Sequence, residues 1–110
     1  MLDTYEVLAQ PIRRSMLDRL RHGECLVGEL ASELGLTQPL TSKHLRVLRD
    51  AGLVQVRIDG PRRWYRLRVD PLVELDRWLT PYRWMWESSL DRLGSHLDAM
   101  PDEQGDIDVR

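Results

Sequence analysis

Apolar residues in the first half of the chain recur with the spacing of short amphipathic helices. The pattern predicts helices over residues 2–9, 11–22 and 26–34, and a fourth over residues 38–50 that begins after Thr37. The link between the third and the fourth of these helices is short and contains a glycine. Two helices joined in this way form a helix-turn-helix.

An alternating pattern, typical of β-strands, replaces the helical one after residue 52. A turn sequence, Asp-Gly-Pro at residues 59–61, separates two such runs. Their inward-facing side chains are predicted to be Val54, Val56 and Ile58 on the first strand and Tyr65, Leu67 and Val69 on the second. A helix-turn-helix followed by a hairpin is the layout of a winged helix. We therefore expect a mainly α fold with a small β-hairpin (α+β).

The last third of the chain predicts one long helix with an apolar stripe. This helix begins near Asp70, is kinked or restarted at Pro81 and ends near residue 99. The stripe of its second half, at alternating intervals of four and three residues, consists of Trp86, Leu90, Leu93, Leu97 and Met100. The preceding elements already fill a winged-helix core, so the stripe predicts packing against a second copy of the chain, in a homodimer. Residues 101–110 are acidic and aperiodic, and we expect a disordered tail after a single domain over residues 1–100.

Charge is divided unevenly along the sequence. The 110 residues include 16 Lys and Arg against 18 Asp and Glu, a net charge of −2. Residues 39–68, in contrast, hold eight basic and two acidic residues, a net charge of +6, which leaves −8 for the rest of the chain. A cationic patch on an acidic body is typical of a surface that binds phosphate.

The fourth predicted helix turns a cationic face outward. At about 100° per residue, Leu45 falls about 40° from Thr41 and Leu48 about 20°, so these three side chains define the buried face. Residues on the far side, with one more at the start of the helix, are the candidates for contact with base edges and phosphates in the major groove: Gln38, Pro39, Ser42, Lys43 and Arg46. The candidates for contact with the DNA backbone or minor groove lie at the tip of the hairpin and are Arg62 and Arg63.

Two residues beside these candidates have other predicted roles. His44 falls at the margin of the buried face, where a lone histidine is more often packed or bonded to the backbone than a ligand. We expect a structural role for it, with contact to a phosphate as the alternative. Trp64 lies among arginines, and its ring could stack on a guanidinium instead of a base.

The run VGELASELGLTQPLTSKHLRVLRDAGLV, followed by DGPRRWYRL, resembles the ArsR/SmtB family of winged-helix repressors. The resemblance covers about residues 5–100. It implies a cytoplasmic homodimer, joined through its first and last helices, that binds operator DNA and releases it when an effector binds. By the resemblance, Gln38, Pro39, Ser42 and Lys43 occupy DNA-contact positions, whereas Arg46 is a candidate by its helical angle alone. Two recognition helices related by a two-fold axis predict an inverted-repeat operator.

The chain departs from the metal-sensing members of that family. Such members place paired cysteines on the third helix in a pattern like ELCVCDL, whereas this chain reads ECLVGEL, with Leu26 and Gly28 at the thiol positions and Cys25 one residue out of step. Near the C-terminus only Asp91 and His96 resemble a second kind of metal site. We therefore expect no metal and no cofactor. Cys25 is expected to be an inert, partly buried thiol; a redox- or metal-responsive repressor that uses it is the alternative.

Motifs and composition exclude other classes of protein. No Gly-rich phosphate loop, nucleophile–base pair or paired-carboxylate motif is present, so we expect no enzyme. A single cysteine, an N-terminus without a cationic start and the lack of a long apolar run predict a cytoplasmic protein with no membrane contact. The alternative functions are a winged helix that binds proteins without direct DNA binding, and an RNA binder. Tryptophans near Pro81 could line a pocket for a small-molecule effector between subunits, although packing alone also explains them.

Overall fold

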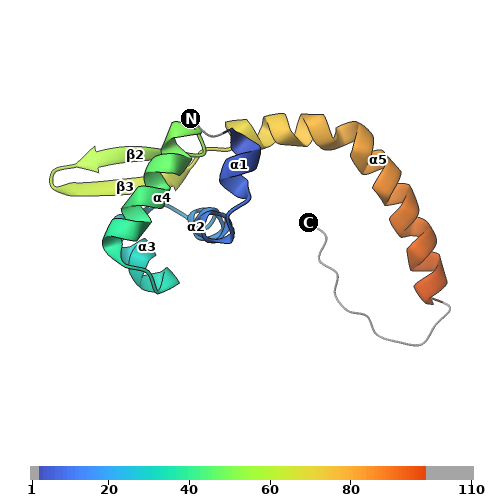
Figure 1. Ribbon diagram of the computed structural model, residues 1–110, viewed down its shortest axis with the longest axis horizontal. Coiled ribbons are helices and arrows are strands. Elements are labelled where there is room, and N and C mark those ends of the chain that lie inside the picture. Colours follow the sequence, from blue (N-terminus) through green and yellow to red (C-terminus); the bar gives the residue numbers. More distant parts are fainter. Residues whose placement is uncertain (1–2, 99–110) are drawn as a thin grey trace. The chain divides into compact units, whose positions relative to one another are not determined.

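The structure, a computed structural model, describes the backbone of residues 3–98 and the side chains of residues 3–90. Its elements in chain order are α1 (Thr4–Leu8), α2 (Pro11–Leu20), β1 (Cys25–Leu26), α3 (Val27–Leu34), α4 (Gln38–Asp50), β2 (Val54–Asp59), β3 (Arg62–Leu67) and α5 (Asp70–Asp98) (Figure 1). The chain forms two units, one that ends at Leu75 and one that begins at Asp76. The first unit is a winged helix-turn-helix, so the predicted fold class is confirmed.

Local signals in the sequence place the helix-turn-helix. Gly35 takes a left-handed backbone conformation, with φ of 69°, and this ends α3. Thr37 caps α4, since its hydroxyl oxygen accepts a hydrogen bond from the backbone N–H of Leu40 at 3.3 Å. Pro39 lies in the first turn, where a helix needs no backbone donor. These are the residues from which the fourth helix was predicted.

The sheet has three antiparallel strands in the order β1-β3-β2. β2 and β3 form the predicted hairpin, with Val54 opposite Leu67 and Val56 opposite Tyr65. The two-residue strand β1, over residues 25–26, was not predicted, because so short a strand shows no alternation. It pairs with β3 through Cys25 opposite Tyr65. Residue 26 accordingly belongs to this strand, and α3 begins one residue later than expected.

The core of the first unit lies between α1–α4 and the inner part of the sheet. Its buried apolar members are Val7, Met16, Leu17, Leu20, Cys25, Leu30, Leu45, Leu48, Leu53 and Val54. Two residues predicted to face inward do not. Ile58 is 63% exposed and Val69 is 52% exposed. Ile58 lies near the tip of the ribbon, which extends past the helices (Figure 1), and Val69 follows the end of β3.

The final helix runs without a break through Pro81, so of the two predicted possibilities the restart is wrong, and a kink at this proline stays a prediction. Next to this proline, the Thr80 hydroxyl donates a hydrogen bond to the Asp76 carbonyl at 2.9 Å. The predicted tail and the end of the predicted domain, over residues 99–110, lie outside the described residues. Among the helices that the structure describes, none is both long enough and apolar enough to cross a membrane.

Candidate nucleic-acid interface

Helix α4 presents the face that the angular argument predicted. Thr41, Leu45 and Leu48 are completely buried, and they fix the helix against the core. Gln38 is exposed at the start of the helix, and the opposite side exposes the other residues predicted for the major groove, Pro39, Ser42, Lys43 and Arg46. Within residues 3–90 no hydrogen bond or ion pair holds the side chains of the last three. Their contact with DNA stays a prediction.

The two arginines at the tip of the wing point to opposite faces of the ribbon. Arg62 pairs with Asp59 across the strands, and Arg63 pairs with Ile58, so the two side chains alternate between faces. Both are exposed. Neither forms an ion pair with any side chain in the described part of the chain. A ribbon of this kind can offer a cation to phosphates on either side of it.

An arginine in the middle of the wing, in contrast, is held by side chains of the same chain. Arg57 Nη2 donates to Glu24 Oε1 at 2.6 Å, and the guanidinium lies over the Trp64 ring at 5.5 Å from its centroid. The hydrogen bond from Arg57 lowers the pKa of the Glu24 carboxyl. Trp64 thus stacks on a guanidinium, as the sequence predicted. A ring that is partly buried under an arginine is a poor platform for unstacked RNA bases.

Ion pairs and hydrogen bonds therefore divide the basic segment into two groups. Arg57, Arg66 and Arg68 contact Glu24, Gln55 and Asp70, respectively. Among the residues with described side chains, no such partner holds the other cations of the segment, which are Lys43, Arg46, Arg49, Arg62 and Arg63. The second group includes every cation that the sequence placed at the interface. These charges are free to meet phosphate.

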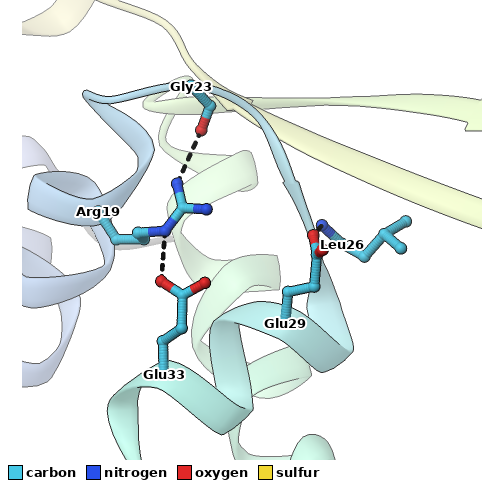
Figure 2. A network of polar contacts seen from close by, with 5 residues as sticks. All are labelled: Arg19, Gly23, Leu26, Glu29 and Glu33. Atoms are coloured by element: carbon cyan, nitrogen blue, oxygen red, sulfur yellow. Dashed lines mark hydrogen bonds and ion pairs between the residues drawn. The ribbon is translucent and has the colours of Figure 1, made fainter.

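A polar network holds the first helix of the helix-turn-helix in place (Figure 2). From α2, Arg19 donates to Glu33 on α3 and to the Gly23 carbonyl, at 3.2 Å in the second case. The Glu29 carboxylate accepts from the backbone N–H of Leu26 at 3.0 Å, which satisfies a free donor at the start of α3. These contacts join α2, the loop at Gly23 and α3 to one another.

One buried charged residue was missed by the sequence reasoning. Arg13, on α2, is only 8% exposed, and its Nε donates to His44 Nδ1 on α4 at 3.2 Å. The sequence held a signal for it, because Arg13 lies three and four positions before the buried Met16 and Leu17 and so shares their face. Burial lowers the pKa of His44, and the charges of Arg13 and Lys43 lower it further. The predicted packed histidine is confirmed.

The single thiol is more deeply buried than expected. Cys25 is 1% exposed, and burial raises its pKa, so the reactive thiolate is disfavoured. The described residues contain no group of three or more His, Cys, Asp and Glu arranged to hold a metal. The candidates Asp91 and His96 lie outside the described side chains. Nothing in the described region supports the alternative in which Cys25 senses metal or oxidant.

The predicted dimerisation stripe is described only at its beginning. Trp86 and Leu90 are 39% and 40% exposed. Leu93 and Leu97 fall on α5, but their side chains are outside the described residues, as is the whole of Met100.

A helix-turn-helix with an exposed polar and cationic helix, followed by a ribbon tipped with arginines, defines the winged-helix DNA-binding class. Residues 10–56 match the family model described as bacterial regulatory protein, arsR family. Over 99 residues, 90% of each chain, the sequence is 42% identical to the HTH-type transcriptional regulator Rv2034 of Mycobacterium tuberculosis. It is also 40% identical over 70 residues to the biofilm growth-associated repressor of Agrobacterium fabrum, covering 64% of this chain and 60% of that one.

Solved structures agree with the sequence relatives. The crystal structure of a possible transcriptional regulator for arsenical resistance has a TM-score of 0.67 and 40% identity, over 92% of this chain and 100% of that one. The solution structure of the homodimeric winged helix-turn-helix DNA-binding domain of Mb0332 from Mycobacterium bovis has a TM-score of 0.59 and 29% identity, over 71% and 72% of the two chains. The chain belongs to the arsR family of bacterial regulatory proteins. It is a transcriptional regulator with a winged helix-turn-helix fold, and not an enzyme.

Proposed function

We propose that this protein is a homodimeric repressor that acts in the cytoplasm on an inverted-repeat operator. Helix α4 enters the major groove of each half-site, and the β2–β3 wing contacts the backbone or minor groove beside it. The observation that carries the proposal is the division of cations in the basic segment, because those on the exposed face of α4 and at the wing tip have no partner in the described chain.

Repression and dimerisation are supported by the relatives and by the second unit. One relative is named a repressor, and one solved relative is described as homodimeric. On α5, Trp86 and Leu90 expose a large part of their apolar surface, which a second copy of the chain would cover. We place the first and last helices at this interface. Two-fold symmetry would then set the half-sites about one helical turn, or a multiple of it, apart.

The wing is tested by a double variant, Arg62→Ala with Arg63→Ala. Each lost phosphate contact should reduce the slope of log affinity against log salt by about 0.9, so each subunit's wing should flatten the slope by up to about two. The affinity for operator and for unrelated DNA should fall together. The measurement is a gel-shift or fluorescence titration at several salt concentrations, with a duplex selected from a random library by the unaltered protein.

Two controls separate the wing from a general loss of charge. Arg21→Ala with Arg77→Ala removes the same charge from exposed positions outside the basic segment, and it should leave the slope almost unchanged. Substitution of Ser42 or Lys43 should instead change which duplexes are selected, since we assign these residues to the major groove, where contacts with base edges determine the sequence preference. An unaltered slope in the wing variant would refute the wing assignment. Failure of the unaltered protein to select any duplex would favour a protein-interaction module.

A further inference from the structure

Between α2 and α4 a buried cation is paired with an imidazole instead of a carboxylate. Arg13 is 8% exposed, and its Nε donates to His44 Nδ1 at 3.2 Å. The Nη1 atom of Arg13 is buried and has no hydrogen-bond partner. Among the residues with described side chains, no Asp or Glu forms an ion pair with this guanidinium. Buried arginines are ordinarily paired with an anion, so this one lacks a counter-charge.

The hydrogen bond fixes the position of the proton on His44. A guanidinium has only donors, so Nδ1 must be the acceptor and must carry no proton. The neutral imidazole then carries its proton on Nε2, as a donor. If Nδ1 were protonated, its N–H would face the N–H of Arg13 Nε, so two donors would meet without an acceptor and two positive charges would repel each other. The charged groups that act on this ring are Arg13 from α2 and Lys43 on α4 itself, and both oppose a positive imidazole.

We propose that Arg13 and His44 together form a phosphate contact of the DNA interface. His44 Nε2–H donates to an oxygen of a backbone phosphate, and that phosphate supplies the counter-charge that Arg13 lacks. Arg13 acts through His44 and is a positioning residue, because it orients the ring and sets its tautomer. The ring is partly buried and lies on the recognition helix at the margin between the buried face and the exposed face that carries Lys43. The inference rests on the proposed DNA-binding function.

Two isosteric substitutions distinguish this contact from a merely structural tie. In His44→Gln the amide nitrogen can take the position of Nε2–H, whereas in His44→Asn the amide oxygen can take the position of Nδ1 and still accept from Arg13. A phosphate contact predicts that His44→Gln keeps most of the DNA affinity and that His44→Asn loses about tenfold on any duplex, the loss expected for one hydrogen bond to a charged group. If His44 only holds Arg13 in place and does not touch DNA, His44→Asn should keep the DNA affinity and His44→Gln should lose it. That result would overturn the proposal.

A pH series tests the role of Arg13. In the unaltered protein, burial and the charges of Arg13 and Lys43 lower the pKa of His44, so DNA affinity should gain little from protonation of this ring on mild acidification from about pH 7.5. Arg13→Gln should weaken binding at about pH 7.5. It also removes one of the charges that lower the pKa of His44, so that pKa should rise and DNA affinity should increase more on acidification than in the unaltered protein. The double variant Arg13→Gln with His44→Asn should lose this rise. An Arg13→Gln profile that matches the unaltered protein would overturn the proposal.

A spectroscopic measurement on the unaltered protein makes the test independent of variant folding. Nitrogen-15 imidazole spectra report directly which ring nitrogen of His44 carries the proton. The Nε2–H tautomer is expected in the free protein, and addition of the selected duplex should shift Nε2 and slow the exchange of its proton. An Nδ1–H tautomer, or a His44 signal that the bound duplex leaves unchanged, would overturn the inference. Loss of DNA binding by the unaltered protein would instead refute the proposed function, so the two failures are distinguishable.

Discussion

The winged-helix unit, here called the body, buries its large apolar side chains, whereas the second half of α5 exposes them. In the body, Leu45, Leu48 and Leu53 are completely buried. On α5, Trp84 is 71% exposed and Leu90 is 40% exposed. The residue types are alike, so the difference lies in what each region packs against within one chain.

This contrast shows which region can be stable alone. The body encloses its own core, and burial of each large aliphatic side chain there contributes about 1.5 to 3 kcal/mol. The second half of α5 leaves such surface in contact with water, and a single helix gains little stability from its own hydrogen bonds. Under the proposed dimer, the stability of this segment depends on protein concentration, whereas that of the body does not.

The largest effect is expected from a matched pair of leucine substitutions. Leu48→Ala leaves a cavity in the core and should lower the free energy of unfolding by about 2 to 5 kcal/mol at every protein concentration. Leu90→Ala should lower it by less, and only at concentrations where the dimer forms. Chemical denaturation at two concentrations, tenfold or more apart, measures both. Equal and concentration-independent losses would remove the distinction between the two regions.

A matched pair of tryptophans sharpens the contrast within α5. Trp84 and Trp86 lie about 200° apart around the helix, so they face nearly opposite sides of it. Trp86→Ala, on the predicted stripe, should weaken dimerisation by about thirtyfold, the effect of losing one aromatic anchor of about 2 kcal/mol. Trp84→Ala should have little effect. Sedimentation equilibrium gives both constants, and a larger loss for Trp84→Ala would place the interface on the other face.

The helix-turn-helix could be predicted from the sequence because its signals are local. Gly35 ends one helix, Thr37 and Pro39 begin the next, and the spacing of Thr41 and Leu45 orients it. Each signal acts over a few residues, so no knowledge of the rest of the fold is needed. The exposure of the candidate groove residues followed from the same periodicity.

The parts that escaped prediction depend on residues far apart in the sequence. The strand β1 exists only because β3 lies beside it, and the Arg13–His44 contact joins positions 31 residues apart. Alternation correctly paired the strands but could not show where the body of the protein ends. Ile58 was therefore predicted to face inward, although the ribbon there has passed beyond the helices.

The arginines of the wing show a similar but smaller contrast, between one that is paired with a carboxylate and one that is not. Arg57 and Arg62 share one face of the ribbon, but Glu24 holds the first, while the second has no partner within the described chain. Glu24 thus occupies the place that a phosphate could take. Glu24→Gln should release Arg57 and strengthen binding to any duplex by about two- to fivefold, the range of an exposed ion pair. It should also steepen the salt slope by up to about 0.9 for each wing.

The matched control for this last effect is Glu33→Gln, which removes an equal charge and releases Arg19 on α2, away from the wing. Both variants make the protein less negative by the same amount, so a general electrostatic effect would change the two slopes equally. Only an effect that acts through Arg57 separates them. If Glu33→Gln steepens the slope as much as Glu24→Gln does, then Glu24 does not compete with DNA for Arg57, and the wing contacts DNA only through its tip.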